Sequence, residues 1–355
     1  MHSPRDLDRA TLAHLEDISQ RTTRLAMSVR RHGYGHVLTT PPEEFYSTPI
    51  PRELHAAVDI VRLQLAWKSE PVACSMHPDL MDELGDMEHT KLPSAMFNHL
   101  AYRNPRIMFP VPVRCKSVIA PSGHGELIAA QVTGRRWVLD PSAQDPMTAP
   151  RLLIPCHSNH PERVRLSVTL INTYDAPGAN GMELSNLELP LDQMREFNPQ
   201  VLIEEFARDE TTGLTAKDLR GWPIEQHLDA FRSKFWPALN ALMYLSNRKM
   251  EAEPAPVRGG SSARRARARD QQPQIHNVGY HRGPELAALR RRWASDCERL
   301  RGTGRVLPHP RRAHYRDWPG GREDGVQVFV SATYVNLDLL DGDDLPTIVP
   351  VGRME

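Results

Sequence analysis

The amino-acid sequence predicts an α+β fold, in which a body of helices and antiparallel strands precedes a small C-terminal αβ module. Apolar residues recur at helical spacing near the N-terminus, short strand-forming runs fill the middle, and helical spacing returns before residue 250. The chain has 355 residues, of which 40% are hydrophobic and 25% charged, so it can bury a core as ordinary globular proteins do. This length predicts two domains or one large domain.

Two helices are predicted first. The first covers residues 6–31, because apolar positions recur there at alternating spacings of three and four residues. The residues of this stripe are Leu15, Ile18, Thr22, Leu25 and Val29. Arg30 and Arg31 suit the negative end of the helix, and Gly33 suits its C-terminal cap. A second helix is predicted over residues 51–68, with Pro in its first turn.

The middle of the chain predicts an antiparallel sheet, after a short helical turn at residues 79–84. Several short runs are bounded by Pro or Gly, and residues 168–171 are strong strand formers. The runs cover residues 107–109, 115–119, 125–132, 136–139, 152–154 and 164–172. Helical spacing returns at residues 199–208 and 223–247, where Pro237 is expected to kink or restart the helix.

The composition changes after residue 250 and predicts three parts: a helix-and-sheet body over residues 1–250, a disordered Arg-rich linker over 251–274, and an αβ module over 275–355. The Pro, Gly, Ser and Arg of the linker cannot bury enough apolar surface to offset the entropy of ordering. Within the module, we predict a strand at 275–278, a helix at 284–301, and a strand pair at 326–330 and 333–336.

The charge of the chain is balanced overall but unevenly distributed. Lys and Arg total 44 and Asp and Glu total 44, which excludes a uniformly basic nucleic-acid coat. Residues 258–316 contain 15 arginines and four acidic residues, a net charge of +11, so the rest of the chain carries −11. This asymmetry favours an anionic partner for the basic third, although a solvated helix face and loop would explain it more simply.

The densest group of chemically active side chains lies in residues 307–318. Its candidates for acid–base chemistry on a phosphodiester are His309 and His314. Its candidates for binding are Arg311, Arg312, Tyr315, Arg316 and Trp318, since guanidinium groups bind phosphate or carboxylate and aromatic rings stack on bases. The alternative is a structural clasp, in which the imidazoles donate to backbone carbonyls and the arginines pair with the acidic body. The candidates for nucleic-acid binding in the linker are Arg264, Arg265, Arg267 and Arg269.

No motif in the sequence predicts an enzyme, a cofactor or a metal. GxSxG and HExxH are absent, and the potential ligands at residues 156–160 have no second pair at zinc spacing. The four cysteines are far apart, which favours reduced thiols and a cytoplasmic protein. No apolar run is long enough to span a bilayer, and the N-terminus leads directly into a charged helix, so neither a membrane association nor a signal segment is expected.

Four segments, in order, carry a resemblance to a known family. The most specific runs from Pro308 to Tyr315 (Pro-His-Pro-Arg-Arg-Ala-His-Tyr), followed by a Gly-rich gap and a strand that ends in Tyr-Val-Asn at residues 334–336. The other three are residues 92–98, 235–245 and 275–283. Together they resemble the type V-A anti-CRISPR family that is second in its series, whose homologues occur on phages and plasmids. Ala313 and Tyr315 stand where this family usually has Gly and Trp.

The resemblance implies a function that the residues alone do not. Members of the family are understood to recognise a segment of the effector nuclease polypeptide, including as it leaves the ribosome, and to provoke loss of its mRNA. The implied partners are therefore the CRISPR effector nuclease polypeptide and, beyond it, the mRNA or the ribosome, in the cytoplasm of a bacterial host. An acidic body suits a basic peptide, and a basic C-terminal third suits RNA.

Two other functions remain open from the residues. The first is a ribonuclease in which His309 and His314 act as acid and base and Arg311 or Arg312 stabilises the phosphorane. The second is a regulatory protein of a plasmid that binds DNA through residues 264–269.

Overall fold

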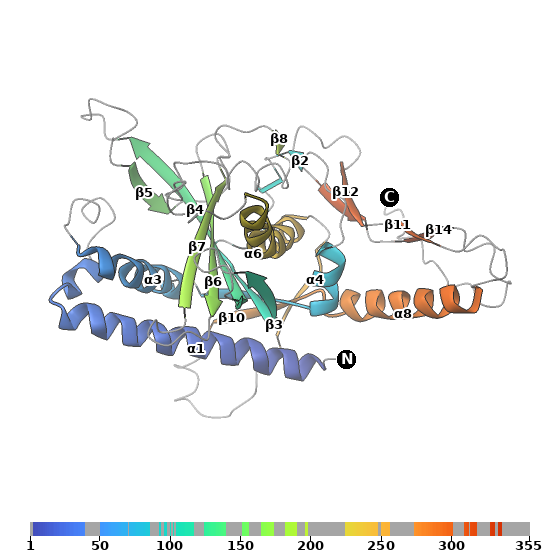
Figure 1. Ribbon diagram of the computed structural model, residues 1–355, viewed down its shortest axis with the longest axis horizontal. Coiled ribbons are helices and arrows are strands. Elements are labelled where there is room, and N and C mark those ends of the chain that lie inside the picture. The colour runs from blue at the N-terminus through green and yellow to red at the C-terminus, as the bar shows by residue number, and fades with distance from the viewer. Residues whose placement is uncertain are drawn as a thin grey trace.

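A mixed eight-stranded sheet forms the centre of the protein, with helices on both of its faces (Figure 1). The computed structural model describes residues 3–39, 50–69, 71–85, 92–93, 96–97, 100, 102, 104–116, 124–139, 151–155, 165–173, 182–189, 196–197, 224–247, 250–255, 273–300, 309–311, 313–317, 327–330 and 333–335. The α+β fold predicted from the sequence is confirmed.

The sheet has the strand order β7-β6-β4-β3-β1-β10-β9, and β5 pairs with β4 beside this path. Its strands are β1 (Val72–Met76), β3 (Arg106–Lys116), β4 (His124–Leu139), β5 (Arg151–Pro155), β6 (Arg165–Thr173), β7 (Met182–Leu189), β9 (Ala252–Pro254) and β10 (Gln274–Val278). From β3 to β7 the neighbours are antiparallel, as the short, tightly connected runs predict. By contrast, β1 is parallel to both β3 and β10.

One face of the sheet is covered by α1 (Pro4–Arg31) and α3 (Arg52–Ser69), and the other by α6 (Ile224–Leu245) with α4 (Pro78–Gly85) (Figure 1). The last long helix, α8 (Arg282–Leu300), packs beside α4. The predicted helices at 6–31, 51–68, 79–84, 223–247 and 284–301 all occur in the structure, with ends shifted by no more than two residues. Among the described helices, none combines the length and apolarity that a membrane span requires.

Side chains of β1 alternate between the two faces, so this strand is buried on both sides. Ala73 joins the cluster beneath α1, whereas Cys74 and Met76 join the cluster beneath α6, and all three are 0% exposed. Burial raises the pKa of the Cys74 thiol, so it stays protonated as an apolar core residue. Cys74 and Cys115 are both unbridged thiols.

The α6 face holds the larger core. Residues Phe235, Ala238, Leu239 and Leu242 of α6 are each no more than 1% exposed, and they lie three or four positions apart on one side of the helix. Pro237 lies inside this helix, which continues past it as one helix, so of the predicted kink or restart the restart does not occur. Burial of apolar residues on both sides of Pro237 offsets the hydrogen bond that its missing N–H removes.

A fully buried guanidinium lies on the opposite face, between the sheet and α3. The Nε of Arg106 donates to Gln131 Oε1 at 2.9 Å, and its Nη1 donates to Gln64 Oε1 at 2.8 Å. The guanidinium also stacks on the ring of Trp67, 3.9 Å from the centroid. Burial lowers the pKa of Arg106 to about 9, because the charged form loses its hydration. Neutral amide oxygens and an aromatic face therefore hold this cation within the described part of the protein.

Three small two-stranded sheets lie outside the central sheet. They are β2 (Leu92–Pro93) with β8 (Glu196–Phe197), β11 (His309–Arg311) with β14 (Thr333–Val335), and β12 (His314–Asp317) with β13 (Gln327–Val330). The predicted strands at 326–330 and 333–336 exist, but the prediction that they pair with each other is wrong. Each pairs with a strand of the His/Arg segment, and Phe329 of β13 packs edge-to-face on Tyr315 of its partner β12.

The central sheet extends past residue 250, where we predicted the body to end. Strand β9 forms within the predicted linker, and β10 lies between β1 and the edge strand β9. Val278 is buried in the cluster beneath α6 and Ile275 packs against the cluster beneath α1, which explains why residues 274–278 join the body. Residues 199–208, for which we predicted a helix, and the Arg-rich part of the linker lie outside the described residues.

The buried Arg106 network gives a first prediction. Gln64→Leu removes the acceptor of Nη1 and leaves a buried charged donor without a partner, so it should lower the free energy of unfolding by about 1–3 kcal/mol. Arg106→Met removes the buried charge together with its desolvation cost, so this variant should be neutral or stabilising. Combining both substitutions should recover most of the Gln64→Leu loss. Urea unfolding followed by circular dichroism measures all three variants, and additive losses in the double variant would contradict the network.

Candidate functional site at the carboxyl ends of β1 and β10

Two adjacent parallel strands end at the same edge of the sheet, and each leads into a helix. β1 is followed by α4, and β10 is followed by α8. In open sheets with parallel strands, ligands are commonly bound at such carboxyl ends, where helix N-termini and the residues after the strands converge. The N-terminal part of α1 reaches the same edge from the other face, because Thr11 contacts Ser75 of β1. This edge is the best-assembled group of polar side chains in the described structure.

A chain of three hydroxyl groups crosses this edge. Thr11 Oγ1 lies 2.7 Å from Ser75 Oγ, which lies 2.9 Å from the phenol oxygen of Tyr280. Thr11 and Ser75 are 0% exposed, so no bulk water competes for these bonds. The pKa of Tyr280 is raised to about 12, mainly by burial and further by the Asp8 carboxylate, while the Ser75 hydrogen bond opposes the rise. Tyr280 is therefore a protonated phenol at neutral pH.

His77 lies beside this chain and is only 3% exposed. Its ring meets that of Tyr280 edge-to-face, with the centroids 5.5 Å apart. The backbone N–H of Asp79 donates to Nδ1 at 3.3 Å, and with Nδ1 as an acceptor the neutral ring carries its proton on Nε2. The Cβ of any residue larger than Gly at position 283 would lie 2.1 Å from the same Nδ1, so Gly283 permits this packing. His77 and Tyr280 thus offer polar atoms from the segments that follow two different strands.

Glu251 fixes the start of α8 from the neighbouring chain segment. Its Oε1 accepts from the His281 backbone N–H at 2.6 Å, and its Oε2 accepts from the Arg282 backbone N–H at 3.0 Å. These are amide groups that a helix N-terminus leaves without intrahelical partners, and a carboxylate there also opposes the positive end of the helix dipole. Next to it, Glu253 Oε1 lies 3.2 Å from His281 Nε2.

Arg290 joins α8 to α4 at the same edge. Its Nη2 lies 3.1 Å from Glu83 Oε2 and 3.3 Å from the Asp79 carbonyl oxygen, and its Nη1 lies 3.5 Å from Asp82 Oδ2. Glu83 is buried, so this pair is screened less than a surface ion pair. The two helices that follow β1 and β10 are therefore held together by a charged contact.

Carboxylates surround this edge. We name Asp79, Asp82, Glu83, Glu251 and Glu253 the acidic rim. Asp82 and Glu253 are the most exposed of those in ion pairs, with side chains 70% and 60% exposed. The arrangement can accept hydrogen bonds and attract a cationic ligand, whereas the fully buried Ser75 is not accessible as a nucleophile. No three His, Cys, Asp or Glu residues within the described ranges are arranged to hold a metal ion.

The structure places part of the predicted His/Arg segment away from this edge. His309 and Arg311 lie in β11, whereas His314, Tyr315 and Arg316 lie in β12, so the two predicted acid–base residues belong to different two-stranded sheets. Along β12, His314 is half-buried and Arg316 is exposed. Arg312, Trp318 and the linker arginines 264, 265, 267 and 269 lie outside the described residues.

Tyr315, which we predicted as a binding residue, is a core residue in the structure. It is 5% exposed and packs on Phe329, which in turn packs on Tyr244 of α6, with ring centroids 5.6 Å and 5.4 Å apart. Burial raises the pKa of Tyr315 well above its usual value. This aromatic cluster attaches β12 and β13 to the α6 face.

Sequence reasoning missed the edge of β1 and β10. We interpreted His77-Pro78-Asp79 only as a break in the chain and a helical turn, although Pro78 and Asp79 are typical of a helix start. The turn Gly279 to Gly283 between a strand and a helix was the second signal. The pairing of β1 with β10 joins residues about 200 positions apart, and no local pattern predicts it.

Gly279 gives a prediction on the turn that starts α8. It has φ +73°, and an added Cβ would lie 2.3 Å from Leu80 Cδ2, so Gly279→Ala combines backbone strain with a clash. We expect a loss of about 2–5 kcal/mol in the free energy of unfolding. The control is Gly33→Ala, which has φ +85° but no atom within 4 Å of the added Cβ, so about 1–2 kcal/mol should be lost. Equal losses in urea unfolding would contradict the close contact with Leu80.

Tyr280 gives a prediction on alkaline stability. Its pKa is raised in the folded protein, so the folded state keeps a proton that the unfolded chain loses above about pH 10. The resulting stabilisation is complete below pH 10 and is lost as the pH rises to 12. Tyr280→Phe should therefore flatten the fall in stability between pH 10 and 12, by at most about 1.4 kcal/mol per pH unit. Unfolding free energies measured at steps across this range test it, and parallel curves for both proteins would contradict it.

Comparison with known proteins identifies the chain's relatives. A family model described as "AcrVA2-like: Anti-CRISPR type V subtype A2 family" matches residues 74–337, which include three of the five residues of β1 together with β10, the acidic rim and the His/Arg segment. No curated protein matches the chain. A solved structure described as "Crystal structure of AcrVA2" is similar with a TM-score of 0.42 and 10% identity, over 93% of this chain and 97% of that chain. By the family match over most of its length, the chain belongs to the anti-CRISPR type V subtype A2 family.

Proposed function

We propose that this anti-CRISPR protein of a mobile element recognises a nascent peptide of the effector nuclease and triggers loss of the mRNA that encodes it. Family membership over residues 74–337 is the observation that carries the proposal. In this view the protein acts in the cytoplasm of the bacterial host, and its partners are the effector polypeptide and, through it, the ribosome and the message.

The acidic rim supports a peptide ligand with basic residues. Its carboxylates come from two separate segments, α4 and the residues around β9, and Glu251 accepts hydrogen bonds from the start of α8. Such a surface attracts Lys and Arg side chains and speeds encounter with a cationic segment. The neighbouring edge of the sheet suits side-chain contacts better than the addition of a peptide strand, because Pro254 in the edge strand β9 has no N–H to donate.

The experiment is co-expression with a type V-A effector gene in two versions, one native and one recoded with synonymous codons. Both genes make the same peptide from different messages. Recognition of the peptide predicts an equal fall of transcript and effector protein for both versions, measured by quantitative PCR and immunoblotting. Loss of the native message alone would mean that RNA sequence is recognised, and unchanged levels of both would contradict the proposal.

A charge-reversal pair tests the acidic rim in the same assay. Asp82→Lys with Glu253→Lys changes two exposed rim carboxylates and should weaken suppression of the effector at least about tenfold, since like charges repel a basic peptide. The matched control is Glu16→Lys with Glu298→Lys, which makes the same change in net charge at exposed positions of α1 and α8. Equal suppression by the rim pair and the control pair would exclude the rim as the peptide site.

The ribonuclease alternative has a direct test of its own. Purified protein that cleaves RNA near neutral pH, and loses this activity in His309→Gln or His314→Gln, would favour it over the proposal.

A further inference from the structure

The C-terminal end of α1 is the most basic surface of the described N-terminal region. Residues 18–42 contain four arginines and two histidines and no acidic residue. This contrasts with the net charge of −11 that the chain carries outside residues 258–316. We name Arg24, Arg30, Arg31, His32, Tyr34 and His36 the basic end of α1. It was not among the nucleic-acid candidates that the sequence suggested.

The arginines of this surface are exposed and uncommitted. Arg24 and Arg31 lie seven residues apart on one side of α1, about 10 Å along its axis, with Met27 exposed between them. Arg21, one turn earlier, forms an ion pair with Asp17 at 2.8 Å. In the part of the chain that the structure describes, Arg24, Arg30 and Arg31 form no hydrogen bond or ion pair through their side chains. Their charges are therefore available to an anion.

A glycine-dependent turn places two aromatic rings beside these arginines. Gly33 adopts φ +85°, its N–H donates to the Arg30 carbonyl at 3.0 Å, and the Tyr34 N–H donates to the Val29 carbonyl at 3.1 Å. This is the Schellman arrangement at a helix end. Gly35 lies so close to the Arg30 stem that an added Cβ would be 2.9 Å from Arg30 Cγ.

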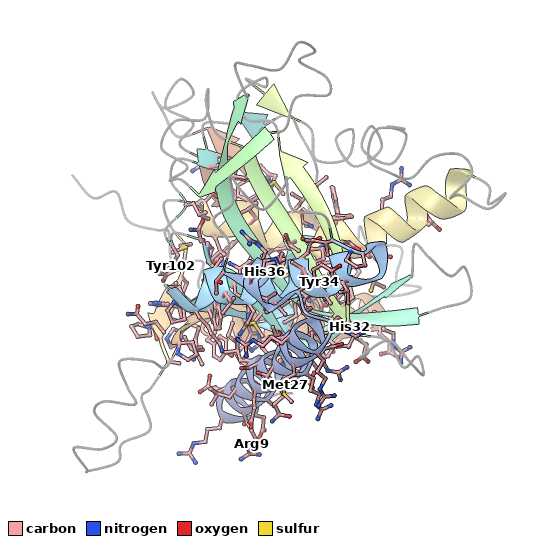
Figure 2. All side chains as sticks on the ribbon, turned by 90° about the vertical axis from the view of Figure 1, so that its left-hand side faces the viewer. Arg9, Met27, His32, Tyr34, His36 and Tyr102 are labelled. Atoms are coloured by element: carbon pink, nitrogen blue, oxygen red, sulfur yellow. The ribbon has the colours of Figure 1, made fainter. Side chains whose placement is uncertain are left out.

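The rings of Tyr34 and His36 are 6.3 Å apart between centroids and inclined by 31°. Figure 2 looks onto this end of the molecule and shows His32, Tyr34 and His36 close together, with Met27 on α1 nearby. The surface thus combines exposed guanidinium groups with two neighbouring rings that are tilted against each other. Arginine and aromatic rings at one place suit phosphates and bases together, whereas an acidic protein surface would use the arginines alone.

The support beneath the surface is rigid. An apolar cluster of α1, η1 (Gly35–Leu38) and α3 packs below it, and Tyr34 contacts this cluster. Arg62 of α3 donates from Nη1 to the Val37 carbonyl at 2.8 Å, which fixes η1 to α3. A ligand would therefore meet side chains whose backbone is already held in place, which reduces the entropy lost on binding.

We propose that the basic end of α1 binds single-stranded RNA, with Arg24, Arg30 and Arg31 on successive phosphates and Tyr34 and His36 against bases. The choice of RNA rather than DNA rests on the proposed function, in which a message is lost. The simpler explanation is that Arg30 and Arg31 only offset the negative end of the α1 dipole, in which case the surface binds no polynucleotide.

The test is binding of purified full-length protein to a fluorescein-labelled 20-nucleotide oligouridylate, followed by fluorescence anisotropy from 25 to 200 mM KCl. The variant is Arg24→Gln with Arg30→Gln and Arg31→Gln. The matched control is Arg5→Gln with Arg9→Gln and Arg291→Gln, which removes the same charge from exposed positions elsewhere. Thermal unfolding of both variants checks that they fold. An oligodeoxyuridylate of the same length tests DNA.

We expect the variant to weaken RNA binding at least about tenfold at 50 mM KCl, and to reduce the slope of log K against log salt by about 2, since each phosphate contact to a single strand contributes about 0.7. The control should retain wild-type affinity. An unchanged slope in the variant, an equal loss in the control, or no RNA binding by the wild type would overturn the proposal. Equal affinity for DNA would overturn RNA as the occupant. None of these readings uses the effector gene, so they are independent of the outcome for peptide recognition.

Discussion

The parallel pairing of β1 with β10 determines how the helices are arranged around the central sheet. Strand β1 is buried on both faces and paired on both sides, so its residues have to satisfy α1 on one face and α6 on the other. The pairing joins two segments about 200 residues apart, at a large entropic cost in loop closure that the burial of Cys74, Met76 and Val278 offsets. Because the two strands run in the same direction, α4 and α8 both begin at one edge, where Arg290 holds them together.

In this arrangement the acidic rim and the basic end of α1 lie on different parts of the surface. The edge where β1 and β10 end carries buried hydroxyl groups and carboxylates, whereas the basic end of α1 lies at the other end of that helix (Figure 1, Figure 2). Helix α1 links the two surfaces. Thr11, near the N-terminus of the helix, contacts β1, and Gly33 lies 22 residues later at the other end of the helix. The proposed peptide and RNA sites are therefore separate surfaces of opposite charge.

Two buried networks, one around the Arg106 cation and one of hydroxyl groups, stabilise polar side chains next to the sheet. Arg106 is held by amide oxygens and the Trp67 ring, and the Thr11–Ser75–Tyr280 chain satisfies each hydroxyl with a neighbouring one. Both connect a helix on the α1 side to the sheet, so they orient α1 and α3 more specifically than apolar contacts alone would. On the α6 face, aromatic packing orients the attached strands instead, since Tyr315 and Tyr244 both pack edge-to-face on Phe329.

Local patterns in the sequence were sufficient to predict most of the helices, part of the sheet and a resemblance to the family. Helical spacing located α1, α3, α6 and α8, and strand-forming runs located the antiparallel part of the sheet, because those signals come from neighbours a few residues apart. The His/Arg segment indicated the family, which the match over residues 74–337 then established. Three features became known only from the tertiary structure. They are the position of β10 beside β1, the pairing of β13 and β14 with different strands, and the burial of Tyr315. Each of these features depends on contacts between apolar surfaces that are far apart in the sequence. The free energy of such contacts cannot be inferred from the spacing of neighbouring residues.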